Sequence, residues 1–238
     1  MCCSARPALH DLRVVKSGAE VRLLRESCRI GAEAVRSAMA ATRSLGTEGA
    51  VLATVEHSAR MAGACHPAYP PVVAAGNNTT VSDLIVFFKG EFFMTKGSIL
   101  QVIHYIAATG AVAEGDLVLV DAGCEYHGYS SDITRTWPAA GSWSPAQLEL
   151  YEALLAVQLQ LVAGIVPGLS SVDSLYRDMQ QLLARELGSL GLVDRDGPHL
   201  SARVHDLCPH HVSHYLVSKG RGLSSLDILL TPVCKQSF

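Results

Sequence analysis

The most informative feature of this chain is the pair Asp121 and Asp132, in the stretch Asp121-Ala122-Gly123-Cys124-Glu125-Tyr126-His127-Gly128-Tyr129-Ser130-Ser131-Asp132-Ile133-Thr134-Arg135-Thr136-Trp137-Pro138. An apolar run before it, residues 117–120, predicts a buried strand that delivers Asp121 at its end. A turn that contains glycine then reverses the chain, and a second β-prone run presents Asp132. Two carboxylates at the mouth of one hairpin repel each other unless a proton or a cation lies between them.

A histidine further along the chain adds a nitrogen donor. His214 lies in Pro209-His210-His211-Val212-Ser213-His214-Tyr215-Leu216, and residues 215–238 contain one acid, Asp227, and no glutamate. Other interpretations stay open on these residues alone. The two aspartates could form salt bridges at a turn, and His214 could be a capping or core histidine.

The composition is that of a globular protein. The chain has 238 residues, of which 49% are hydrophobic and 17% are charged, and this is enough for one large domain or two small ones. The net charge of −3 gives no electrostatic reason to expect nucleic acid or an anionic membrane as a partner. Seven cysteines without paired spacing predict free thiols. We expect no secretory signal in residues 1–16, and residues 84–88 are too short an apolar run to span a bilayer.

Hydrophobic periodicity predicts helices before the hairpin. Residues 17–43 carry apolar side chains at steps of three and four, namely Val21, Leu24, Cys28, Ala32, Val35 and Met39. Thr47 is expected to cap a second helix that continues to about Ala62. A strand is expected to start at residues 72–73, after two prolines.

The same order of elements recurs after the hairpin. Ser144-Pro145-Ala146-Gln147 predicts a capping box at the start of a long helix, and Ser171 the start of another. A β-prone run follows near residues 210–217. Two halves of helix, helix and strand predict a pseudo-symmetric α/β domain whose sheet is covered by helices.

With these motifs in order, the chain resembles the metallopeptidases of the pita-bread (creatinase/aminopeptidase-like) fold. Within them it resembles an Xaa-Pro aminopeptidase (aminopeptidase P) of the mitochondrial type. The resemblance covers about residues 12–76 and 102–216. Its landmarks are Leu12-Arg13-Val14-Val15-Lys16-Ser17, Tyr69-Pro70-Pro71-Val72-Val73, Gly76-Asn77, His104-Tyr105, Asp121-Ala122-Gly123-Cys124-Glu125, residues 131–138, and Cys208-Pro209-His210-His211-Val212.

The resemblance implies a metal site and an activity. Asp121 and Asp132 match the two metal-binding aspartates of the family, Asp132 being the one that bridges both ions, and His214 matches the metal-binding histidine. His104 and His210 match substrate-side histidines. In that family two divalent ions, usually manganese, hold a hydroxide that attacks the peptide bond before a proline at position two. A mitochondrial or cytosolic location is implied in the same way, and a homo-oligomer is left open.

The chain departs from the family pattern in three places. Residues 78–101 form an insert that matches nothing in the family and is expected to be either a disordered loop or an aggregation-prone strand. After residue 216 the family continues with a further catalytic histidine and two glutamate ligands, whereas residues 217–238 here form an unrelated tail. The separate N-terminal domain of the family is not found either. We therefore expect an α/β pita-bread domain at residues 12–216 that is truncated in its second half.

Two functions are predicted as alternatives. The first is a manganese-dependent aminopeptidase whose activity is impaired, with a peptide carrying proline at position two as its partner. The second is an inactive splice fragment that binds or competes with the full-length protein. Val217-Ser218-Lys219 and Ile99-Leu100-Gln101 can be encoded by sequences that resemble splice signals, so we hypothesise that residues 78–101 and 217–238 are translated intron.

Overall fold

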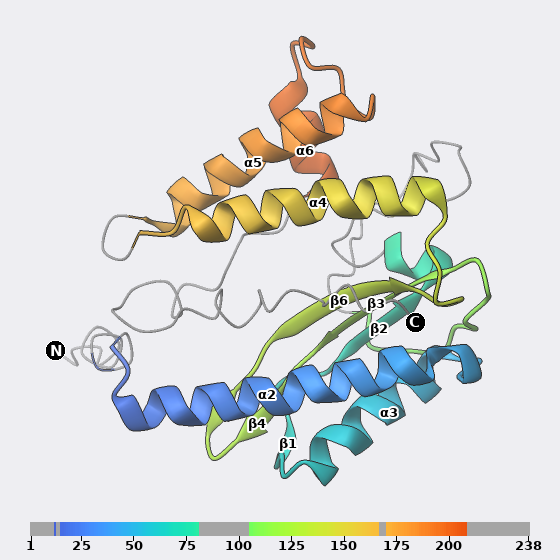
Figure 1. Cartoon of the computed structure of the whole chain (residues 1–238), viewed down its shortest axis with the longest axis vertical. Helices are drawn as coiled ribbons and strands as arrows, with labels where there is room; N and C mark the ends of the chain where they lie inside the picture. The colour runs from blue at the N-terminus through green and yellow to red at the C-terminus, as the bar shows by residue number, and fades with distance from the viewer. Residues whose placement is uncertain (1–11, 13–14, 81–104, 167–169, 209–238) are drawn as a thin grey trace, which may run out of the picture. The chain divides into compact units, whose positions relative to one another are not determined.

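The computed structural model describes residue 12 and residues 15–80, 105–166 and 170–208, and the chain divides into two compact units (Figure 1). Of the described residues, 23–80 and 105–149 belong to one unit, and residues 12, 15–22, 150–166 and 170–208 belong to the other. The aspartate pair lies in the first of these units. In the described part of the chain, no helix is long and apolar enough to cross a membrane.

Two helices precede the strands of the first unit. Helix α2 spans Gly18–Ala41 and is followed by the short 3-10 helix η1 (Thr42–Ser44), and helix α3 spans Glu48–Met61. The Thr47 side chain accepts a hydrogen bond from the Ala50 backbone N at 3.2 Å, which confirms the predicted cap of α3.

The buried face of α2 differs in part from the predicted stripe. Cys28 and Val35 are buried as expected, but Val21 and Leu24 are only half-buried. The centre of the buried face consists of small residues and one isoleucine instead, namely Ser27, Ile30, Gly31, Ala34 and Ala38. Small side chains let the helix approach the sheet closely. The predicted stripe missed them because it was drawn mainly through the larger apolar residues.

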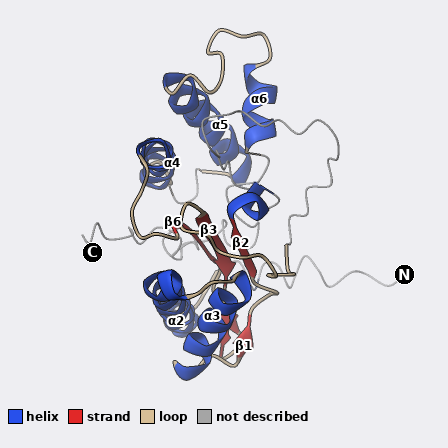
Figure 2. Cartoon of the chain, turned by 90° about the vertical axis from the view of Figure 1, so that its right-hand side faces the viewer, coloured by secondary structure: helices blue, strands red, loops and turns tan. Residues whose placement is uncertain are grey.

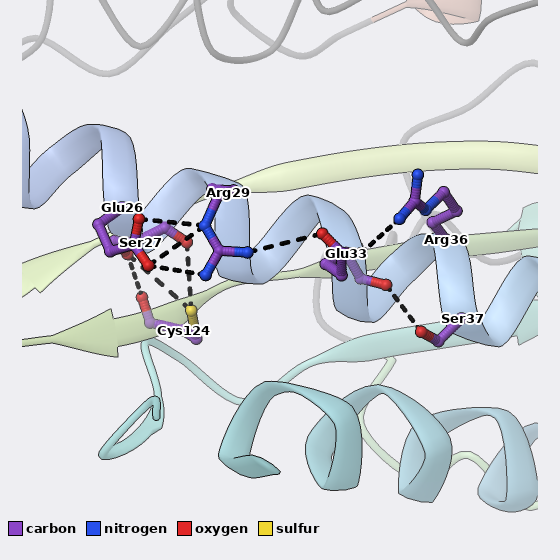
Figure 3. A network of polar contacts seen from close by, with 7 residues as sticks. All are labelled: Glu26, Ser27, Arg29, Glu33, Arg36, Ser37 and Cys124. Atoms are coloured by element: carbon purple, nitrogen blue, oxygen red, sulfur yellow. Dashed lines mark hydrogen bonds and ion pairs between the residues drawn. The ribbon is translucent and has the colours of Figure 1, made fainter. Parts of the chain in front are cut away.

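The outward side of α2 carries alternating charges at steps of three and four (Figure 3). Arg29 pairs with Glu26 at 2.7 Å and with Glu33 at 3.6 Å, and Arg36 pairs with Glu33. These side chains are largely exposed, so each pair adds little to stability. They mark this face of the helix as the solvated one.

The strands form two small antiparallel sheets. Strands β2 (Val72–Ala75), β3 (Leu117–Ala122) and β6 (Ile133–Pro138) form one sheet in the order β2-β3-β6, and the 3-10 helix η2 (Gly76–Thr80) follows β2. Strands β1 (His66–Pro67), β4 (Cys124–Tyr126) and β5 (Tyr129–Ser130) form the other, in the order β1-β4-β5.

The predicted hairpin is confirmed as a long antiparallel ribbon. The segment β3–β4 runs out and β5–β6 returns in one register, from Leu117 opposite Pro138 to Tyr126 opposite Tyr129. The turn consists of His127 and Gly128, whose φ angles of 49° and 84° are both positive. A two-residue turn of this kind matches the twist of the strands and fixes their register.

Helices α2 and α3 cover one face of the sheet β2-β3-β6 (Figures 1 and 2). The core between them contains Ile30 and Val35 of α2, Val51 and Val55 of α3, and the strand residues Val73, Val118, Val120 and Ile133. Because side chains alternate along a strand, Asp121 lies on the opposite face from Val118 and Val120.

In the residues described, the other unit contains most of helix α4 and the whole of helices α5 and α6. Helix α4 spans Pro145–Ala163, α5 spans Val172–Ser189 and α6 spans Leu200–Leu207. Both predicted helix starts are confirmed: Ser144 and Gln147 bond each other's backbone N, and Ser171 and Ser174 do the same. Helix α6 was not predicted, and its first turn has no side-chain cap that a sequence pattern could reveal. The strand expected near residues 210–217 lies outside the described residues.

Candidate metal centre

The strand register brings the two predicted aspartates to one face of the sheet. Asp121 of β3 pairs with Thr134 of β6, and Ala122 pairs with Ile133. Asp132 comes directly before Ile133, so it lies on the same face as Thr134. Asp121 and Asp132 are therefore diagonal neighbours across the ribbon, within reach of a common partner.

A single hydroxyl lies between the two carboxylates. The Tyr69 hydroxyl donates to Asp121 Oδ1 at 2.5 Å, and Asp132 Oδ1 is a second acceptor at 3.0 Å. The two carboxylate oxygens are thus no farther apart than the sum of these distances. This contact shows that the carboxylates converge on one point.

Burial, together with the charges of the pair, keeps this hydroxyl protonated. Burial, then the charges of Asp121 and Asp132, and then the hydrogen bonds to them raise the pKa of the Tyr69 hydroxyl above its ordinary value. Tyr69 therefore acts as a neutral donor between two anions. In the sequence Tyr69 was only part of a landmark, and no local pattern around it indicates this role.

The glycine between the two strand segments is required by a close approach. A Cβ atom on Gly123 would lie 1.8 Å from the Ser131 carbonyl oxygen and 3.0 Å from Cε1 of Tyr69. No side chain fits there, because real Cβ contacts essentially never fall below about 3.0 Å. Gly123 thus allows the return strand to bring Asp132 beside Asp121.

A fully buried carboxylate, that of Glu48, lies at the start of α3. Glu48 is 0% exposed. Its Oε1 accepts from the Ala75 backbone N at 2.7 Å and from Asn78 Nδ2 at 2.9 Å. Its Oε2 accepts from the Tyr105 hydroxyl at 2.8 Å and from the Gly110 backbone N at 2.7 Å. The carboxylate therefore joins the end of β2 to the residues on both sides of the segment 81–104, a role that the sequence analysis missed.

The three predicted histidines, His104, His210 and His214, all lie outside the described residues. Within the described ranges, no group of three or more His, Cys, Asp and Glu side chains comes together as a metal site. The aspartate pair itself fits a divalent cation. It supplies two anionic oxygens on one face, and hard divalent cations prefer oxygen ligands of this kind.

The fold is that of a known class of metallopeptidases. The sequence pattern of metallopeptidase family M24 matches residues 22–222, and the chain belongs to this family. The chain has the pita-bread fold of the family and contains part of the complete domain. This confirms the family and the fold that the sequence predicts.

Within the family the chain is similar to Xaa-Pro aminopeptidases. It is 33% identical to Xaa-Pro aminopeptidase 3 of Rattus norvegicus over 213 residues, which are 90% of this chain and 38% of that protein. It is 35% identical to the mitochondrial intermediate cleaving peptidase 55 of Arabidopsis thaliana over 208 residues, which are 87% of this chain and 36% of that protein. The chain thus spans well under half the length of these relatives.

The solved structures that resemble this chain include an aminopeptidase P and Icp55. Aminopeptidase P from Escherichia coli with the inhibitor Pro-Leu has a TM-score of 0.73 and 30% identity, covering 89% of this chain and 44% of that one. Icp55 from Saccharomyces cerevisiae has a TM-score of 0.68 and 27% identity, covering 87% of this chain and 46% of that one.

Proposed function

We propose that this chain is an aminopeptidase that releases the N-terminal residue from peptides with proline at position two. Its family and its similarity to Xaa-Pro aminopeptidases support this proposal. The observation that supports it best is the convergence of Asp121 and Asp132 on the Tyr69 hydroxyl, because two carboxylate oxygens that meet at one point would attract a cation.

The residues have distinct proposed roles. Asp121, Asp132 and His214 would hold a divalent cation, and carboxylates with one imidazole suit manganese. A bound divalent cation lowers the pKa of water and polarises a carbonyl group. Tyr69 would hold the aspartates in place by donating to them. His104 and His210 would bind the peptide on the carbonyl and proline sides.

The second candidate is a chain with little or no catalytic activity. Residues 215–238 contain one acid, Asp227, and two cations close together need more negative charge than two aspartates supply. In this case the chain holds at most one cation weakly, and it binds or competes with a longer form of the protein. Residues 78–101 and 217–238 would then be translated intron, and sequencing the transcript tests this by locating the exon junctions.

One experiment separates the two candidates. The purified chain is incubated with Mn²⁺ and two peptides that differ only in having proline or alanine at position two, and the released residue is measured by mass spectrometry. The first candidate predicts Mn²⁺-dependent release from the proline peptide alone. Asp132→Asn abolishes this release, whereas Asp173→Asn, a change of an exposed aspartate on α5, leaves it intact. Absence of release from both peptides supports the second candidate.

A mitochondrial or cytosolic location is proposed from the resemblance, and the name of the Arabidopsis relative supports the mitochondrial one. Microscopy of a fluorescent fusion tests it. The assembly of several copies remains a prediction, which light scattering of the purified chain tests.

A further inference from the structure

A buried polar cluster joins α2 to two residues that lie close in sequence to the aspartates. It consists of Ser27 of α2, Cys124 of β4 and Ser131, which is the residue before Asp132. Their side chains are 0%, 2% and 2% exposed, respectively. Burial of polar groups costs free energy unless they are paired, so the contacts within this cluster decide its effect.

The contacts join the helix to both strands of the ribbon. The Ser27 hydroxyl donates to the Cys124 carbonyl oxygen at 2.9 Å, and the Cys124 thiol donates to the Ser27 carbonyl oxygen at 3.4 Å (Figure 3). The Ser131 hydroxyl accepts from the Cys124 backbone N at 3.0 Å, and the Ser131 backbone N donates to the Cys124 carbonyl oxygen at 3.0 Å. The Cys124 carbonyl oxygen is thus held by both Ser27 and Ser131, and the Cys124 backbone N by Ser131.

Helix α2 also approaches this cluster closely at Gly31. A Cβ atom on Gly31 would lie 2.7 Å from the Ser131 hydroxyl oxygen and 3.1 Å from Cδ1 of Ile133. The close approach of α2 therefore coincides with the residue before Asp132 and the residue after it. At this point α2 leaves no room for a side chain between itself and the residues that flank Asp132.

We propose that Ser27 and Ser131 are positioning residues for the cation site. The cluster fixes the backbone of Asp132 relative to that of Asp121, since Cys124 follows Gly123 on the strand that carries Asp121. Its integrity sets the affinity of the aspartate pair for a divalent cation. This inference rests on the proposed function only in assigning cation binding to the two aspartates.

The test compares metal affinity with stability. Ser131→Ala removes the acceptor of the Cys124 backbone N, and the dissociation constant for Mn²⁺, measured by calorimetry, is expected to rise about tenfold or more, the size of effect typical of residues that support metal ligands. Ser27→Ala is the milder variant, because the Cys124 carbonyl keeps the Ser131 backbone N as a donor. If both act through one cluster, their effects on affinity are not additive.

The control removes a buried hydroxyl from the same helix–sheet layer. Thr42 is 2% exposed; its hydroxyl donates to the Ala38 carbonyl oxygen at 2.6 Å and accepts from Trp137 Nε1 at 2.9 Å. Trp137 lies five residues beyond Asp132, roughly 16 Å along an extended strand. Thr42→Ala is expected to lower the melting temperature and to leave the Mn²⁺ affinity unchanged.

The outcomes are distinguishable. If Ser131→Ala and Ser27→Ala lower the melting temperature as Thr42→Ala does but bind Mn²⁺ like the unmodified chain, the positioning role is wrong. If the unmodified chain itself takes up no Mn²⁺, the proposed function fails instead. The inference is then decided by the ¹³C resonance of the Asp132 carboxylate in metal-free protein. That resonance must move in Ser131→Ala and stay in place in Thr42→Ala, and a resonance that does not move in Ser131→Ala overturns the inference.

Discussion

Replacement of Glu48 by alanine is expected to remove much of the stability of the unit that carries the aspartates. The carboxylate is fully buried and accepts hydrogen bonds from Ala75, Asn78, Tyr105 and Gly110. Each buried donor left without an acceptor costs about 1–3 kcal/mol. Water that enters the vacated space recovers part of this, so we expect a loss of about 3–6 kcal/mol, against a total of about 5–15 kcal/mol for a typical domain.

The conservative variant separates charge from shape. Glu48→Gln keeps one oxygen but turns an amide N–H₂ toward donors, so we expect a smaller loss, about 1–3 kcal/mol. The assay is urea unfolding followed by the fluorescence of the buried Trp137, with the midpoints compared at a constant slope. Glu114→Ala, a change of an exposed glutamate in the same unit, serves as the control. A Glu48→Ala midpoint equal to that of the control would refute the reasoning.

Three further predictions concern the surroundings of the pair. Gly123→Ala places a Cβ 1.8 Å from the Ser131 carbonyl oxygen, so the ribbon must open there; circular dichroism should show a loss of about 1–3 kcal/mol or more, and an unchanged melting curve would contradict the close approach. Tyr69→Phe removes the donor between the carboxylates, and the metal-free protein should lose about 1 kcal/mol; equal melting temperatures in the presence of a chelator would rule this out. Burial, then the charges of Cys124 and Asp132, raise the pKa of the Cys28 thiol from 9.0 to about 12. The folded state therefore holds this proton longer than the unfolded one, and stability falls as the pH rises from 9.0 to about 12; Cys28→Ala should flatten this part of the curve, and an unaltered slope would count against it.

Most of the sequence predictions that the structure confirms depend on patterns within a few residues of each other. The helix starts at Thr47, Ser144 and Ser171 depend on hydrogen bonds that reach only three residues along the chain. The aspartate pair was also predictable, because the two-residue turn at residues 127–128 fixes the register that makes Asp121 and Asp132 diagonal neighbours.

The interactions that sequence reasoning missed are those between distant residues. Tyr69 meets its two aspartates across 52 and 63 residues, and Glu48 meets Gly110 across 62. No spacing rule links such positions, because only the packing of α3 and the strands brings them together. The buried face of α2 was predicted only in part, for a related reason. A close approach to the ribbon is made by Gly31, which has no side chain to enter a hydrophobic pattern.

The most direct test of the account is a count of bound Mn²⁺ by electron paramagnetic resonance, since free and bound Mn²⁺ differ in signal. The account predicts that the chain takes up at least one Mn²⁺. It predicts also that Asp121→Asn and Asp132→Asn each weaken this uptake about tenfold or more, while Asp173→Asn does not. Uptake by both aspartate variants equal to that of the unmodified chain would contradict the claim that this pair of carboxylates forms the metal centre.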